Sequence, residues 1–211
     1  TAPVGTSVSP AANGSVGTLT FGNASSFDGS LTLDGGTLEM DISNAAKDLI
    51  VANNGFSITE NGGTVALNVS GTLNNGNYTL ISAPDGIFGS LGAVVVTGFS
   101  QPGQIAFLDS SSTAVTLIVA NAGDANLVWT GSAGNFWDVE TTASWTSNAV
   151  SATFVQGDSV IFNATGAGQP VVDLQAAVFP TTVTVDATSD YTLTTTAGGR
   201  LGGATGLTKN N

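Results

Sequence analysis

Apolar and polar residues alternate along most of this 211-residue chain, in short runs that Gly, Asn, Asp or Pro separates. The clearest case is an internal repeat, in which residues 30–42 (SLTLDGGTLEMDI) align without gaps on residues 57–69 (SITENGGTVALNV). In both copies every second residue is apolar: Leu38, Met40 and Ile42 in the first, Val65, Leu67 and Val69 in the second. A period of two places apolar side chains on one face of a strand and polar ones on the other. Each copy therefore predicts a strand, a Gly-Gly turn and a second strand.

Further strands of the same kind are predicted on both sides of the repeat. They cover residues 17–21, 48–52, 77–83, 92–99, 103–108 and 113–120, and later residues 152–162, 169–174, 181–187 and 190–196. Only residues 43–49 (SNAAKDL) read as helical, for at most a turn or two. The pattern therefore predicts an all-β protein.

A repeat whose period lies in the twenties, built from short strands and glycine turns, is typical of a β-solenoid. Successive coils then stack, and their strands pair in parallel. The sequences DGG and NGG are also good hairpin turns, so an antiparallel arrangement, such as a pair of β-sandwiches, is the alternative.

Residues 121–126 (NAGDAN) are small, polar and turn-prone, which predicts a boundary. We expect a β-solenoid segment in residues 1–120. Residues 121–211 are expected to hold a tryptophan-containing junction followed by further strands. The two regions could then be two stacked solenoid segments. The chain ends within a glycine-rich pattern, so we expect it to be part of something longer.

Composition excludes several classes of function. The net charge is −12, with Lys47, Arg200 and Lys209 as the cations, which disfavours binding to nucleic acid or to an anionic membrane surface. No apolar run is long enough to span a bilayer as a helix. The chain has no Cys and no His, which excludes disulfides and triads that depend on either residue. We expect a protein that is not an enzyme, has no catalytic residues and needs no cofactor.

All three tryptophans, Trp129, Trp137 and Trp145, lie in one segment of 17 residues, WTGSAGNFWDVETTASW. Indoles offer flat faces and an N–H donor, so they could form a carbohydrate-binding platform. Bulky aromatic side chains also pack into a core or cover the end of a solenoid. Residues 131–135 form a predicted turn between the first two indoles, so alternation does not place them on one face. We favour packing at a junction and keep carbohydrate binding as the alternative.

Carboxylates gather near the first turn of the repeat. Two of the three residues Asp34, Glu39 and Asp41 could hydrolyse a glycoside as a pair of carboxylates, or the group could bind Ca²⁺. Glu39 and Asp41 alternate with buried positions, however, and the second copy has Ala66 and Asn68 at the matching places. We therefore expect both carboxylates on a solvent face, with no metal site assigned and Ca²⁺ kept only as an alternative.

The order of these motifs resembles a known family. The segments GTLTF, GSLTLDGGTLEMDI, DLIVANNGFSITENGGTVALNV and GNYTLISAPDGIFGSL are similar to the passenger region of autotransporter-type proteins. The segment from LVWTGSAGNFW to GLTK resembles the start of another array in bacterial surface proteins with autotransporter-associated β-strand repeats. This resemblance implies a right-handed parallel β-helix, extracellular or on the cell surface of a bacterium. It covers nearly the whole chain, but TKNN stops where such a repeat should continue, and no translocator barrel is present.

From these observations we expect a non-enzymatic structural or adhesive segment of a long surface protein or self-associating fibre. Its partners would be other copies, through head-to-tail stacking of open solenoid ends, and surface glycans are a second class. The alternative function is a carbohydrate-binding module that uses Trp129, Trp137 and Trp145.

Overall fold

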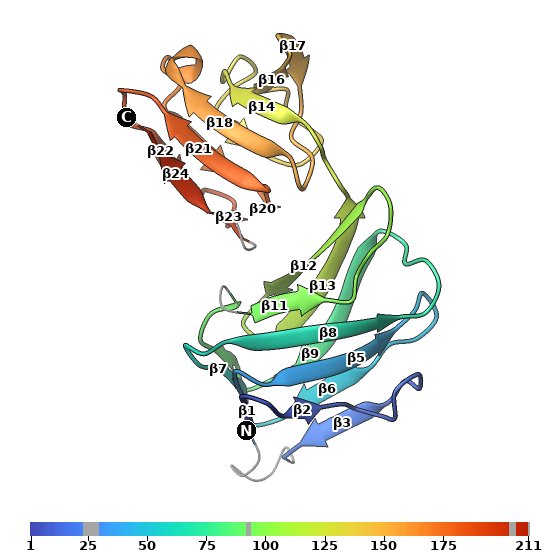
Figure 1. Ribbon diagram of the computed structural model, residues 1–211. Helices are drawn as coiled ribbons and strands as arrows, with labels where there is room; N and C mark the ends of the chain where they lie inside the picture. Colours follow the sequence, from blue (N-terminus) through green and yellow to red (C-terminus); the bar gives the residue numbers. More distant parts are fainter. Residues whose placement is uncertain (23–29, 92–93, 203–205, 211) are drawn as a thin grey trace. The chain divides into compact units, whose positions relative to one another are not determined.

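The computed structural model describes residues 1–22, 30–91, 94–202 and 206–210, and within them the chain is built almost wholly of strands (Figure 1). The 3₁₀ turn Ala164–Gly166 is a short exception. Parallel sheets stack as a β-solenoid of about seven turns. The predicted all-β solenoid is therefore confirmed, and the antiparallel β-sandwich alternative is wrong.

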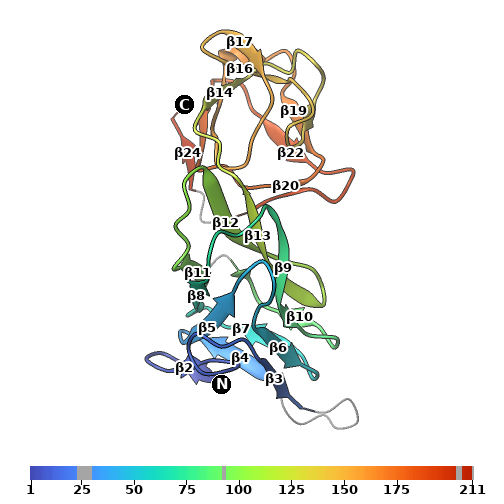
Figure 2. The ribbon, with the colours of Figure 1, turned by 90° about the vertical axis from the view of Figure 1, so that its right-hand side faces the viewer.

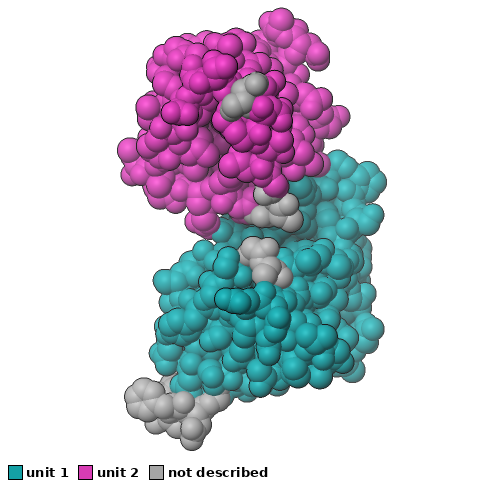
Figure 3. Space-filling view, turned by 60° about the vertical axis from the view of Figure 1, so that its left-hand side comes forward, with its two compact units in different colours: residues 1–120 teal, residues 121–211 magenta. Residues whose placement is uncertain are grey.

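The chain forms two compact units, Thr1–Ala120 and Asn121–Asn211 (Figure 3). The division falls at the segment NAGDAN, where the sequence places a boundary. Each unit has its own cluster of buried apolar side chains, and the two clusters share no residue.

Three sheets form the walls of the first unit, and each successive coil adds one strand to each sheet (Figures 1 and 2). The first sheet has the order β1-β4-β7-β10, with β1 (Ala2–Pro3), β4 (Leu31–Asp34), β7 (Phe56–Ile58) and β10 (Ile87–Phe88). The second has the order β11-β8-β5-β2, with β2 (Ser7–Val8), β5 (Thr37–Ile42), β8 (Gly63–Val69) and β11 (Val94–Thr97). The third has the order β12-β13-β9-β6-β3, with β3 (Thr18–Phe21), β6 (Leu49–Ala52), β9 (Gly76–Ser82), β12 (Gln104–Ser110) and β13 (Ala114–Asn121).

The internal repeat corresponds to stacked coils, but its two strands stack with different offsets. Strands β5 and β8 pair in parallel with Leu38 opposite Val65, as the gapless alignment predicts. Strands β4 and β7 place Leu33, and not Leu31, opposite Ile58. This offset is 25 residues, two fewer than in the gapless alignment, because the turn 59–62 is two residues longer than the turn 35–36. The apolar side chains determine the register, and the turn accommodates the extra length.

Residues 43–49 do not form the predicted helical turns. The Ser43 backbone N–H donates to the Ala46 carbonyl at 2.8 Å, and Ile42 bridges to Lys47, so the segment is a tight turn before β6. One end of the third sheet also departs from the parallel pattern. Strand β13 pairs antiparallel with β9, and β12 lies beside β13 across the loop 111–113. This pair of strands closes that edge of the first unit.

The second unit repeats the design around three sheets. The first has the order β17-β16-β14-β18-β21-β24, with β14 (Asn126–Trp129), β16 (Trp145–Ser147), β17 (Val150–Ala152), β18 (Ser159–Asn163), β21 (Thr182–Asp186) and β24 (Leu207–Lys209). The second has the order β15-β19-β22, with β15 (Phe136–Trp137), β19 (Val171–Leu174) and β22 (Thr192–Thr194). The third pairs β20 (Ala177–Val178) with β23 (Arg200–Leu201). From β14 to β24 the first sheet is parallel, whereas β16 and β17 add an antiparallel hairpin at its other edge.

The hairpin of β16 and β17 turns through two residues with positive φ, Asn148 at 49° and Ala149 at 64°. Such a turn suits Asn followed by Gly, because a Cβ in the left-handed region costs free energy. We expect Ala149→Gly to raise the free energy of unfolding by about 1 kcal/mol, measured by urea denaturation followed by tryptophan fluorescence. As a control, Ala152→Gly, within β17, should lower it. A loss of stability in Ala149→Gly would contradict this account of the turn.

Candidate functional site

The three tryptophans form one cluster inside the second unit, and each has 0% of its surface exposed. The ring centroids of Trp129 and Trp145 lie 4.9 Å apart and those of Trp137 and Trp145 lie 5.1 Å apart, both in edge-to-face geometry. Phe154 packs against Trp137, and Phe162 contacts all three indoles. These aromatic side chains are the centre of the unit's core.

Three strands of the first coil bring the indoles together. Trp129 on β14 is the register partner of Trp145 on β16, and Trp137 lies on β15. The Trp129 indole N–H donates to the Gln169 carbonyl at 2.9 Å. Gly166 lies so close that a Cβ there would be 2.4 Å from the Trp129 ring. The antiparallel hairpin thus places bulky side chains at the end of the coil stack, within the second unit.

The burial of Trp129, Trp137 and Trp145 does not support the carbohydrate-platform alternative, which stays a prediction. Stacking on a sugar requires an exposed ring face, and none of these rings has exposed surface. Within the described residues, the indole N–H groups of Trp137 and Trp145 are buried without a hydrogen-bond partner. Their edge-to-face neighbours provide favourable aromatic contacts in place of hydrogen bonds. The structure therefore assigns the tryptophans to core packing.

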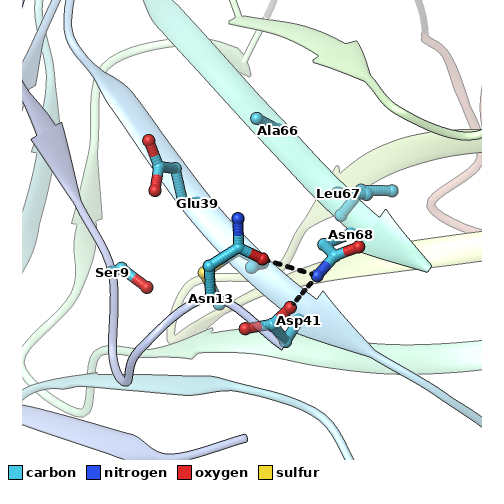
Figure 4. Close-up of a pocket in the computed structure, with 8 residues that line it drawn as sticks. Ser9, Asn13, Glu39, Asp41, Ala66, Leu67 and Asn68 are labelled. Carbon is cyan, nitrogen blue, oxygen red and sulfur yellow. Dashed lines mark hydrogen bonds between the residues drawn. The ribbon is translucent and has the colours of Figure 1, made fainter. Parts of the chain in front are cut away.

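A shallow pocket of about 190 Å³ lies over the second sheet of the first unit (Figure 4). It is lined by Ser9, Asn13, Glu39, Met40, Asp41, Ala66, Leu67 and Asn68. Glu39 is exposed, as expected, so it is free to face solvent at the pocket. This pocket is the place where the sequence-predicted carboxylates and neighbouring amides meet.

Asp41 is buried, which contradicts its predicted place on a solvent face. Only 7% of its surface is exposed, because the connection between β2 and β3 folds over β5. The Gly14 backbone N–H donates to both carboxylate oxygens, at 3.0 and 3.1 Å, and the Asn68 amide also donates to Asp41 (Figure 4). A carboxylate held in this way joins three successive coils.

Asp48 is a second buried carboxylate and was not identified from the sequence as a candidate. It has no exposed surface, and its two oxygens accept hydrogen bonds from the backbone N–H groups of Gly17 at 2.7 Å and Asp41 at 2.8 Å. These partners belong to the first coil and the second coil. A possible signal was its place directly before a strand, where Asp commonly binds backbone amides.

Other acidic residues bridge coils in the same manner. Asp34 accepts hydrogen bonds from the Thr59 hydroxyl at 2.6 Å and the Asn61 amide at 2.8 Å. Asp158 accepts from the backbone N–H of Ala125 at 2.9 Å. Asp173 does the same with Thr196 at 2.8 Å. Carboxylates are therefore part of the stacking of both units.

Two of these carboxyl groups have shifted pKa values, in opposite directions. Hydrogen bonds from Thr59, and then from Asn61, hold the pKa of Asp34 below its usual value. Burial raises the pKa of Asp158, although hydrogen bonds from the Val155 and Ala125 amides oppose the shift.

The two shifts predict opposite dependences of stability on pH. Asp34 contributes stability above the unfolded carboxyl pKa of about 3.9, and this is lost as pH falls through its lowered folded pKa. For Asp158 the contribution is present below the unfolded pKa and is lost as pH rises through the raised folded pKa. In urea titrations between about pH 3 and pH 7, the stability difference between wild type and Asp34→Asn should grow with pH, and that for Asp158→Asn should shrink. Equal slopes for the two variants would contradict this assignment.

Within the described ranges, no group of three or more Asp or Glu side chains is arranged to hold a metal ion. The calcium alternative for Asp34, Glu39 and Asp41 thus has no such cluster to support it. No helix in the described part of the chain is long and apolar enough to cross a membrane.

The chain matches no protein-family model, no curated protein and no solved structure. The resemblance to autotransporter passengers stays a prediction from the sequence.

Proposed function

We propose that the chain is a non-enzymatic structural β-solenoid segment, displayed outside a bacterial cell, where it builds or anchors an extended surface protein or fibre. The observation that carries this proposal is the use of its buried carboxylates. Asp41 and Asp48 bind amides of neighbouring coils, and so does Asp158. Carboxylates are residue types that can act in catalysis, but in this chain these three stabilise the stacking of the coils.

The composition supports the same function. The chain is rich in small polar residues and carries a net charge of −12, which suits a protein surface exposed to solvent. The indoles, which would be the best groups for recognising a glycan, are in the core. Adhesion would therefore use the outer faces of the sheets.

Immunogold electron microscopy of intact cells of the source organism tests the location. Antibodies raised against the purified chain should label the outside of the envelope before permeabilisation. Label that is seen only after permeabilisation would overturn the proposal.

The absence of catalysis is tested separately, on purified protein with a panel of acidic and neutral polysaccharides. No release of reducing ends is expected. Hydrolysis that disappears in Glu39→Gln, with an unchanged circular dichroism spectrum, would contradict a purely structural function, because Glu39 is the exposed carboxylate of the pocket. The matched control is Glu60→Gln, at an exposed position in a turn.

A further inference from the structure

The connection between β2 and β3 carries an Asn-Gly pair at the centre of a tight turn. The Ser15 backbone N–H donates to the Ala12 carbonyl at 2.9 Å, and Gly14 has φ of +85°. Since Asn13 does not share this positive φ, the turn is of type II. Asn13 and Gly14 are both exposed, so the turn presents the pair to water.

An Asn-Gly pair is prone to spontaneous deamidation, because glycine has no side chain to hinder ring closure. At this turn the Gly14 nitrogen would give its proton to water and bond to Cγ of Asn13. The Cγ–Nδ2 bond would break, and Nδ2 would take up a proton from water and leave as ammonia. Water then opens the succinimide ring at either carbonyl, which gives aspartate or isoaspartate without any oxidant or reductant.

The structure holds this turn away from the geometry that the reaction needs. Ring closure requires a large rotation about the Asn13 Cα–C bond from the type II conformation, so that the Gly14 nitrogen reaches the side chain. The Gly14 N–H donates to both oxygens of Asp41, at 3.0 and 3.1 Å, which opposes the rotation. The Asn68 amide donates to Oδ1 of Asn13 at 2.8 Å, which fixes the carboxamide that the nitrogen would attack (Figure 4).

This fastening differs from that of other Asn-Gly pairs in the chain, which lie at residues 54–55, 61–62 and 75–76. The Gly55 N–H donates to the Ala52 carbonyl at 3.1 Å, within its own turn. The Gly62 N–H likewise donates to the Thr59 carbonyl at 2.9 Å. At Gly14 the acceptor is instead a side chain 27 residues later. The turn at Gly14 is therefore held by a distant contact, which a local opening can break.

The product of deamidation would not be held in the same way. Either product adds a negative charge at position 13, close to Asp41, since the Asn68 amide nitrogen contacts both side chains. Like charges at this separation repel. Isoaspartate also lengthens the main chain by one carbon atom, which shifts the Gly14 N–H away from Asp41.

We propose that Asn13 is a self-modification site, whose deamidation is gated by the contacts of Asp41 and Asn68 and leaves the turn released. Local opening of the turn gives access to the reactive conformer, and the covalent step makes the opening irreversible. This chemistry goes beyond the proposed structural function and does not depend on where the chain is displayed.

Peptide mapping by mass spectrometry, during a long incubation at neutral pH, measures deamidation at each Asn-Gly pair. Asp41→Asn and Asn68→Ala should each react at Asn13 about tenfold faster than wild type, because each weakens hydrogen bonds that hold the turn. Glu39→Gln is the matched control, since it removes a carboxylate from the same strand and pocket, and its rate should equal that of wild type. An unchanged rate at Asn61 in all four proteins shows that the fold is intact.

The sign of the change distinguishes gating from catalysis. Slower deamidation in Asp41→Asn or Asn68→Ala would mean that these side chains promote the reaction, and an unchanged rate would mean that they do not control it. Either result overturns the proposal, as does wild type that reacts at Asn13 as fast as the urea-unfolded chain, or no reaction in any variant.

Amide hydrogen exchange at Gly14 tests the released state. Asn13→Asp, which carries the charge of the product, should exchange at Gly14 about tenfold faster than wild type. Wild type should approach the same rate as deamidation proceeds. Asn13→Gln, whose longer side chain closes a ring slowly, should keep its initial rate throughout the incubation. Exchange at Gly14 that stays constant while wild type deamidates would show that modification does not release the turn, and would overturn the proposal.

Discussion

Replacing Trp145 with alanine should lower the unfolding free energy of the second unit by about 4 kcal/mol. Trp145 has no exposed surface and contacts Trp129, Trp137, Phe154 and Phe162. Alanine would leave a cavity that these rings cannot fill without losing contacts among themselves. Since small domains are stable by only about 5–15 kcal/mol, much of the unit's stability depends on this side chain.

The measurement is urea denaturation followed by the fluorescence of Trp129 and Trp137, which both lie in the second unit. The first unit has its own core and should keep its amide spectrum in two-dimensional NMR. Trp145→Phe is the control, because it retains an aromatic ring and removes the indole N–H that has no partner among the described residues. It should cost less than half as much as alanine. A loss below about 1 kcal/mol in Trp145→Ala would show that the cluster is not the centre of the core.

How far the sequence predicts this fold depends on how local each feature is. Alternation in residues 37–42 and 64–69 is local, and it correctly predicts which side chains of β5 and β8 face the core. The register of β4 on β7 is not local, because it depends on how much chain the intervening turn takes up. A gapless alignment pairs residues by their position in the sequence. In the structure the strands pair where their apolar side chains stack, and the longer turn 59–62 shifts the pairing of β4 with β7.

The candidate site shows the same limit. Period two correctly places Asp41 on the outer face of its strand, and exposure would follow if nothing else covered that face. The turn at Gly14, which has φ of +85°, lies 27 residues earlier in the chain and folds over this face. No pattern within β5 contains that information. For the tryptophans, composition identified the cluster, but only the pairing of β14 with β16 shows that Trp129 and Trp145 are neighbours.

Replacing Asp48 with alanine should release the first coil from the rest of the first unit. The carboxylate is fully buried and accepts hydrogen bonds from the N–H groups of Gly17 and Asp41. Alanine leaves both donors without their acceptor, which should cost about 2–6 kcal/mol, since each buried unsatisfied donor costs about 1–3 kcal/mol. The effect should be local at first, because Gly17 leads directly into β3, an edge strand.

Amide hydrogen exchange monitors this release at individual residues. Exchange at Gly17 and Asp41 should become about thirtyfold faster or more in Asp48→Ala, as expected for a local loss of about 2 kcal/mol. The amide of Leu117 on β13, three strands away from β3 in the sheet order, is the internal control and should keep its rate. Asp48→Asn retains one acceptor oxygen but presents an amide to the second N–H, so it should fall between wild type and alanine. Unchanged protection at Gly17 would mean that the coil is held by its strand pairing alone, and that Asp48 does not link it to the next coil.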